Sequence, residues 1–388
     1  MNSFDQLINR KDTGSLKWDN MPQKLGLTGN DLLPMWVSDY DFKAPTLVLD
    51  ALQQRIDHGV FGYSERDDTY YQAIIDWYQN HHNTVVKKEW ITTVHGVLPG
   101  LSLAIQMLTK SGDSIVLQSP GYGSFRKIIN LNDRVVVENP LLENDGEYQL
   151  DFEHLEACFA QGTKVLIFCN PHNPTGRVWS EAEVLKIAEL CRKYHVWLLS
   201  DEIWGDLAIS DKQYYSALRL PDLLRERLIV ATAASKTFGL SSLRISNFMI
   251  PDESVRSEYL RNLDAHGMDV FNCLSIVAAT TAYQTCSDWL EELRSYLREN
   301  ITQLEQFISK ELSGVRFIPP QAGYLAWLDC RLLNLTDTEL EERFIRAGIV
   351  PSMGISFGKE GTGFVRLNLG CPKATLNEAF IRIKEALT

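Results

Sequence analysis

Short apolar runs alternate with longer segments of helical period through most of the chain. The segment EAEVLKIAELCRKYH at 181–195 places its apolar residues on one face and its charges on the other, and Ser180 before it suits a helix N-cap. This helix separates two apolar runs, an order typical of parallel strands joined by crossover helices. The pattern predicts an α/β fold with a mostly parallel sheet covered by helices. We expect its clearest strands at 114–119, 164–170, 196–201 and 228–234.

The pattern changes after about residue 285. A long charged amphipathic helix leads there into three shorter apolar runs, which predicts a smaller α+β domain at 285–388. Residues 46–284 form the expected large domain, and residues 1–45, which lack clear periodicity, are expected to pack on the small domain. A chain of 388 residues exceeds the size of a single core, so two domains are expected.

Composition narrows the classes of function. The formal net charge of −12 argues against nucleic acid or an anionic membrane as the partner, because both need a basic face. Neither a signal peptide nor an apolar stretch long enough to span a bilayer is visible, so we expect a cytoplasmic enzyme. The seven cysteines are scattered without a CxxC pair, which predicts reduced thiols and no metal site.

Polar residues follow three neighbouring apolar runs at the points where the predicted strands end. Asn173 follows the first, Asp201 ends the second, and Ser235 and Lys236 follow the third. Ligands of open α/β sheets bind beyond the carboxyl ends of the strands, so these side chains are candidates for one site. A lysine amine and a carboxylate in this position match the needs of pyridoxal 5'-phosphate (PLP), which binds a lysine covalently and pairs its ring nitrogen with an acid.

A second sequence signal matches the phosphate of such a cofactor. In TTVHGVLPGLSLAIQML a strand turns through Gly96 into a helix, so the backbone N–H groups of Val97 and Leu98 are expected to point at an anion. Ser235 and Arg244 would complete the cradle, Arg244 as a forked donor. Tyr122, just beyond a predicted strand, is expected to stack on the ring.

These motifs together resemble the fold-type I PLP enzymes of the aminotransferase class I/II superfamily. The matching segments are NPHNPTG at 170–176, SDEIWGDL at 200–207 and SKTFGLSSLR at 235–244, in the family's order. The resemblance covers essentially the whole chain. It implies the fold-type I architecture and PLP as the cofactor, with Lys236 as the catalytic residue that also takes up the substrate's α-proton.

Within this superfamily the chain is similar to the C–S β-lyases of the cystathionine β-lyase and MalY/PatB type. The segments that carry the likeness are 33–45, 58–64, 322–329 and 363–373. The resemblance implies β-elimination from a sulfur amino acid to pyruvate, ammonia and a thiol. It also implies that Arg366 binds the substrate carboxylate, with Asn173 and Ser38 nearby and Asp39 beside them. Tyr63 would reach the cofactor phosphate of a neighbouring subunit, so a homodimer with shared active sites is expected.

Three positions depart from the lyase pattern. Trp204 stands where relatives usually carry Tyr or His, Gly239 replaces a common asparagine, and Arg244 is more typical of aminotransferases. An aminotransferase that needs a 2-oxo acid is therefore the alternative enzyme. A protein that keeps the cofactor fold but acts by binding a protein partner is the alternative outside catalysis.

Overall fold

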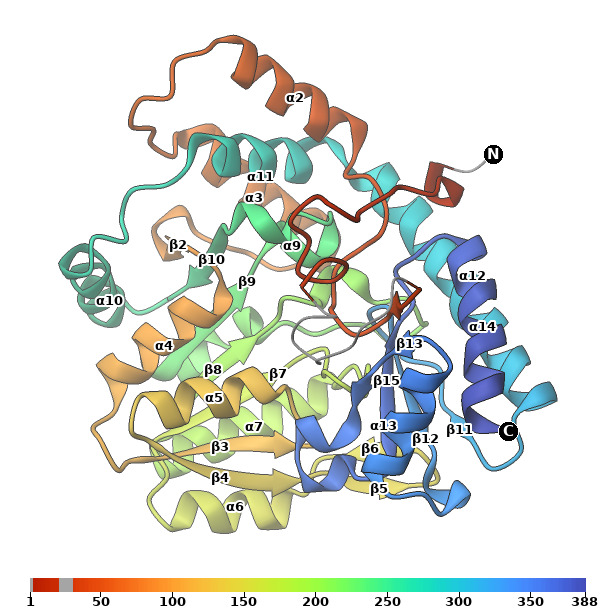
Figure 1. Cartoon of the computed structure of the whole chain (residues 1–388). Coiled ribbons are helices and arrows are strands. Elements are labelled where there is room, and N and C mark those ends of the chain that lie inside the picture. Colours follow the sequence, from red (N-terminus) through yellow and green to blue (C-terminus); the bar gives the residue numbers. More distant parts are fainter. Residues whose placement is uncertain (1–2, 21–30) are drawn as a thin grey trace.

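A seven-stranded sheet forms the centre of the computed structural model, which describes residues 3–20 and 31–388 (Figure 1). Its strands run in the order β2-β10-β9-β8-β7-β3-β4, and β10 is antiparallel to both of its neighbours. The prediction of a mostly parallel sheet is confirmed. The strand bounds are Ile91–Val94 (β2), Ser246–Met249 (β10), Leu228–Thr232 (β9), Trp197–Asp201 (β8), Val165–Cys169 (β7), Ser114–Ser119 (β3) and Val135–Pro140 (β4).

Helices cover both faces of this sheet because its strands are apolar on both sides. Along β3, Ile115 and Leu117 share a core cluster with α4, α5 and α10, whereas Val116 belongs to the cluster that contains α3, α6, α7 and α11. Helix α2 packs on α11. The helix bounds are Thr46–Asp57 (α2), Asp68–His82 (α3), Val97–Leu108 (α4), Gly123–Leu131 (α5), Phe152–Ala160 (α6), Glu181–Tyr194 (α7), Pro221–Leu224 (α8), Ala234–Thr237 (α9), Glu253–Ala265 (α10) and Cys273–Thr285 (α11).

A smaller sheet and three helices follow in the chain. The antiparallel order is β11-β12-β15-β14, and these strands share a separate apolar cluster with α12, α13 and α14. The bounds are Ser287–Glu311 (α12), Arg316–Phe317 (β11), Leu325–Asp329 (β12), Asp337–Arg346 (α13), Ile349–Val350 (β13), Ser352–Met353 (β14), Phe364–Asn368 (β15) and Lys373–Leu387 (α14). A small hairpin, β5 (Leu142–Asn144) with β6 (Glu147–Gln149), lies between β4 and α6.

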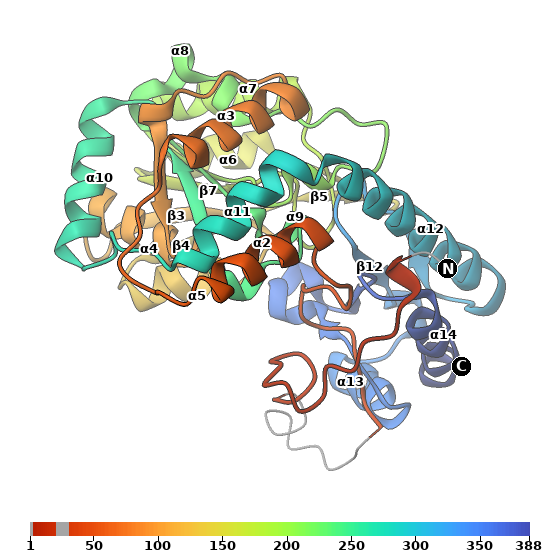
Figure 2. The same ribbon diagram turned by 90° about the horizontal axis from the view of Figure 1, so that it is seen from above.

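The described residues before α2, 3–20 and 31–45, lie beside the helices of the smaller sheet (Figure 2). Strand β1 (Leu33–Pro34) pairs in parallel with β13, and Leu33 and Met35 join the apolar cluster of α12 and α14. Phe4 packs edge-on against Trp289 in α12. Whether the domain boundaries fall at residues 45 and 284 stays a prediction.

Local sequence signals account for several element ends. Ser180 and Glu183 form a reciprocal capping box at the start of α7, as the N-cap prediction requires. The strand expected at 228–234 was too long, because β9 ends at Thr232 and Ala234 already begins the short helix α9. Within the described residues, none of the helices is both long and apolar enough to cross a membrane.

Candidate active site

One cavity of about 770 Å³ lies at the carboxyl ends of β7, β8 and β9. The structure brings ten predicted site residues together along its wall. They are Ser38, Gly96, Val97, Leu98, Tyr122, Asn173, Asp201, Ser235, Lys236 and Arg244. Arg366 is not among the lining residues but contacts Asn173, and Tyr63 lies apart with its side chain 96% exposed.

Lys236 enters this cavity from α9, directly after β9. Ala233 and Ala234 are buried before it, so the backbone stays close to the sheet while the lysine side chain extends into the cavity. Its Nζ donates a hydrogen bond to the backbone oxygen of Ser38 at 2.6 Å. Burial lowers the pKa of Lys236 to about 8, although the negative charges of Asp39 and Asp201 oppose the effect. A sizeable fraction of the amine is therefore neutral at mildly alkaline pH.

Asp201 is the last residue of β8 and is 5% exposed. Burial raises its pKa to about 7, and the neighbouring Glu202 adds to the rise. In the described part of the chain its one hydrogen-bond donor is the N–H of Ile203, at 3.1 Å. No cation is therefore hydrogen-bonded to this carboxyl among the described residues. The protonated ring nitrogen of PLP would supply one and would favour the charged form of Asp201.

An anion cradle lies at the start of α4. Gly96 is the N-cap with a φ of 110°, and as a glycine it has no side chain that could cap the first backbone N–H groups of this helix. The Arg244 Nη2 donates to the backbone oxygen of His95 at 3.4 Å, and a Cβ placed on Gly96 would lie 4.0 Å from that nitrogen. A helix N-terminus beside a guanidinium attracts a phosphate. Ser241 and Ser242 also line the cavity here, and both lie within the matched segment 235–244, although neither was predicted to be a site residue.

Arg366 reaches the site from β15 of the smaller sheet. Its Nη1 donates to Asn173 Oδ1 at 2.9 Å and its Nη2 to the backbone oxygen of Trp36 at 2.8 Å. Burial lowers its pKa to about 10, so the group stays cationic at neutral pH. Its buried Nε has no hydrogen-bond partner among the described residues, which leaves donor capacity for a carboxylate.

Two of the three sequence departures have a structural explanation. Trp204 is 5% exposed and packs edge-on against Tyr324, with 4.9 Å between ring centroids, so it fills the cavity wall. Gly239 has a φ of 71°, a left-handed conformation that glycine and asparagine both adopt. The glycine is therefore compatible with the same backbone conformation that an asparagine would adopt at this position.

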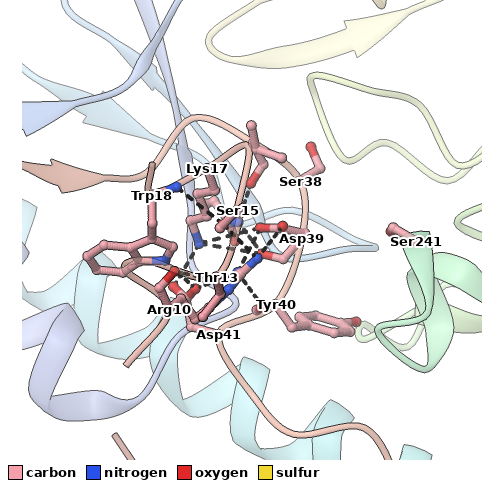
Figure 3. A network of polar contacts seen from close by, with 12 residues as sticks. Arg10, Thr13, Ser15, Lys17, Trp18, Ser38, Asp39, Tyr40, Asp41 and Ser241 are labelled. Carbon is pink, nitrogen blue, oxygen red and sulfur yellow. Dashed lines mark hydrogen bonds and ion pairs between the residues drawn. The ribbon is translucent and has the colours of Figure 1, made fainter. Parts of the chain in front are cut away.

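Two further residues at this site were not predicted from the sequence. Tyr324 OH donates to the same Ser38 oxygen as Lys236, at 3.0 Å. Arg10 lines the cavity from the N-terminal segment and forms an ion pair with Asp39 at 2.8 Å (Figure 3). Tyr324 lies inside the matched segment 322–329, but Arg10 lies in a stretch without periodicity or motif, so no signal marked it.

Comparisons with known proteins agree with this arrangement. The model of the family Aminotransferase class I and II matches residues 30–383. The chain belongs to this family. It is 40% identical to the cystathionine beta-lyase PatB of Bacillus subtilis over all of both chains, and 32% identical to the protein MalY of Escherichia coli over 100% of this chain and 99% of that one.

A solved structure extends the likeness to three dimensions. Cystalysin from Treponema denticola, whose structure contains pyridoxal 5'-phosphate, superposes with a TM-score of 0.96 at 32% identity, covering 99% of this chain and 98% of that one. The predicted fold-type I architecture and the predicted resemblance to the MalY/PatB group are therefore confirmed.

Proposed function

We propose that this protein is a PLP-dependent carbon–sulfur lyase that cleaves cystathionine or a related cysteine S-conjugate by β-elimination. The observation that carries the proposal is one cavity that holds a lysine amine, a buried carboxyl and an anion cradle. The full-length likeness to PatB, a cystathionine beta-lyase by name, supports the lyase reaction within the family.

The residues of the cavity fit PLP. Lys236 supplies the amine that binds it, Asp201 the acid for its ring nitrogen, and Gly96, Val97, Leu98, Ser235 and Arg244 the donors for its phosphate. Tyr122 would stack on the ring, and Asn173 would serve both the ring oxygen and the substrate; both residues line the cavity. PLP, when bound, supplies a conjugated ring that accepts the electron pair left at the substrate's Cα.

The side chains then divide the remaining work. Arg366 binds the substrate's α-carboxylate, and Asn173 is already fixed against it. The amine of Lys236 takes up the α-proton as general base, for which a pKa of about 8 is well suited. The Cβ–S bond breaks and a thiol leaves, and hydrolysis of the remaining three-carbon part yields pyruvate and ammonia.

A homodimer with shared sites is part of the proposal. Tyr63 is too exposed to act within its own chain, and the segment around it also exposes Val60 (63%) and Phe61 (58%). Contiguous exposed apolar residues are typical of an interface. We assign Tyr63 to the phosphate of the second subunit's cofactor.

The decisive experiment incubates the purified PLP-loaded protein with L-cystathionine and no 2-oxo acid. The lyase releases one pyruvate and one thiol per substrate consumed, which lactate dehydrogenase and a thiol reagent measure. An aminotransferase turns over only when a 2-oxo acid is added, so turnover restricted to that condition would replace the lyase assignment by the alternative. Arg244 does not decide between the two, since it belongs to the anion cradle.

A further inference from the structure

Four charged residues form a partly buried cluster between the N-terminal segment and the loop at 37–41 (Figure 3). We call Arg10, Lys17, Asp39 and Asp41 the N-terminal ion-pair cluster. Lys17 Nζ lies 2.7 Å from Asp41 Oδ2 and 3.8 Å from Asp39 Oδ1. Arg10 contacts both carboxylates at 2.8 Å. Lys17 is only 1% exposed, so its amine contacts these carboxylates in place of water.

The cluster fixes the loop at 37–41 from one side, and the smaller sheet fixes it from the other. Arg10 Nη1 donates to the backbone oxygen of Tyr40 at 2.8 Å, and Trp18 Nε1 donates to Asp41 Oδ1 at 2.9 Å. From β15, Asn368 Nδ2 donates to the backbone oxygen of Asp39 at 2.7 Å. A loop held from both sides has little freedom to move its backbone oxygens.

This loop presents two groups to the lysine. The Ser38 oxygen accepts from Lys236 Nζ and from Tyr324 OH, and the Asp39 carboxylate lines the same cavity. The charged groups that act on Lys236 come from three elements: Asp39 from the loop, Asp201 from β8 and Arg366 from β15. Of these, Asp39 is the one whose carboxylate is oriented by the N-terminal segment.

We propose that the N-terminal ion-pair cluster is a positioning device for Lys236, which holds the Ser38 oxygen against the lysine amine and keeps the Asp39 carboxylate at the wall of the same cavity. Arg10 and Lys17 act through the loop, and neither needs to contact substrate. The cluster combines two cations with two anions, and its burial offsets much of the Coulomb attraction. The cluster therefore serves mainly to place the loop, and it adds little to the stability of the fold. The proposal rests on the proposed role of Lys236.

The test measures the titration of Lys236 directly in the full-length chain after removal of PLP. Acetic anhydride modifies only neutral amines, and mass spectrometry of the peptide that contains Lys236 gives its labelling rate at each pH. Asp39→Asn removes the negative charge and keeps the side chain's size. We expect the midpoint of the labelling curve to fall by roughly half a pH unit or more, because an opposing charge no longer favours the ammonium form.

Asp329→Asn is the matched control. Asp329 is also held by two cations, Arg316 and Arg331, at 2.7 and 2.9 Å, but it does not line the cavity. The control should leave the Lys236 midpoint unchanged. Equal midpoints in the wild-type and Asp39→Asn chains would overturn the proposal, as would equal shifts in both variants.

A second pair of variants tests the loop's anchorage. Lys17→Met removes the cation that anchors Asp39 and Asp41, so the loop should loosen and the Asp39 carboxylate should move away from Lys236. The midpoint should then fall, although the loss of a positive charge alone would raise it, whereas Lys17→Arg should keep it near the wild-type value. A folded Lys17→Met chain with an unchanged midpoint would contradict the positioning role. If Lys17→Met does not fold, Asp39→Asn still decides the matter. A wild-type chain that binds PLP and cleaves cystathionine while Asp39→Asn shows no shift would sink this inference alone.

Discussion

The depressed pKa of Lys236 makes a stability prediction for the PLP-free chain. The pKa is about 8 in the folded chain instead of the ordinary 10.5, because burial disfavours the ammonium form. Between these values the unfolded chain binds more protons, so stability rises with pH there, and the penalty is fully present below about pH 8. At 1.36 kcal/mol per pH unit, the gap corresponds to roughly 3 kcal/mol.

Lys236→Met removes the charge and keeps an unbranched side chain that is only one atom shorter. It also loses the hydrogen bond to the Ser38 oxygen, which costs about 1 kcal/mol, although Tyr324 still donates to that oxygen. Near pH 7 the variant should therefore be more stable than the wild-type chain by about 2 kcal/mol. Near pH 10.5 this advantage should disappear, because the wild-type amine is then neutral in the folded chain and about half neutral in the unfolded chain, so little of the penalty is left.

The assay is urea unfolding of both PLP-free chains, followed by tryptophan fluorescence at several pH values. The difference in unfolding free energy between wild type and variant cancels the contributions of all other titrating groups. Lys193→Met is the control, since Lys193 is 61% exposed and pairs with Glu156 at the surface. A stability difference between Lys236→Met and wild type that stays constant from pH 7 to 10.5 would refute the pKa reasoning.

Three further predictions concern the backbone, the substrate and the subunit contact. Gly239→Ala should lower the unfolding free energy by about 1–2 kcal/mol, because the backbone φ of 71° is left-handed and the new Cβ would lie 3.1 Å from Tyr40. In the same urea assay, Gly239→Asn should lower the unfolding free energy by less. Arg366→Lys should reduce kcat/KM for cystathionine by about 10- to 100-fold, since a forked, charge-assisted contact is lost; an unchanged ratio would remove Arg366 from the carboxylate site. Mixing Tyr63→Ala with Lys236→Ala chains should restore lyase activity that each lacks alone, and mixtures that stay inactive after verified subunit exchange would argue against shared sites.

The sheet and the residues at its carboxyl ends could be predicted from the sequence. Strands such as Val165–Cys169 are buried on both faces, so they are continuous apolar runs, and the polar residues that follow them stand out. The parallel order of β7, β8 and β9 then places Asn173, Asp201 and Lys236 in one cavity. The positions of these residues along the sequence were therefore enough to predict this part of the site.

The remainder of the site depends on contacts between distant segments. Lys17 contacts Asp41 only because the N-terminal segment folds back on the loop at 37–41, and neither segment carries a periodic pattern. Strand β10 was also missed, because four residues, Ser246–Met249, are too few to show a period. The contact of Tyr324 with the Ser38 oxygen spans 286 positions in sequence and has no local signature.

We propose that the amine of Lys236 performs the proton transfer that leads to C–S cleavage. Its most direct measurement is pyruvate release from L-cystathionine by wild-type and Lys236→Ala proteins, each supplied with PLP, with and without added methylamine. We expect steady release by the wild-type protein, none by Lys236→Ala, and partial recovery when the small amine replaces the missing one. Pyruvate release by Lys236→Ala at the wild-type rate would contradict it.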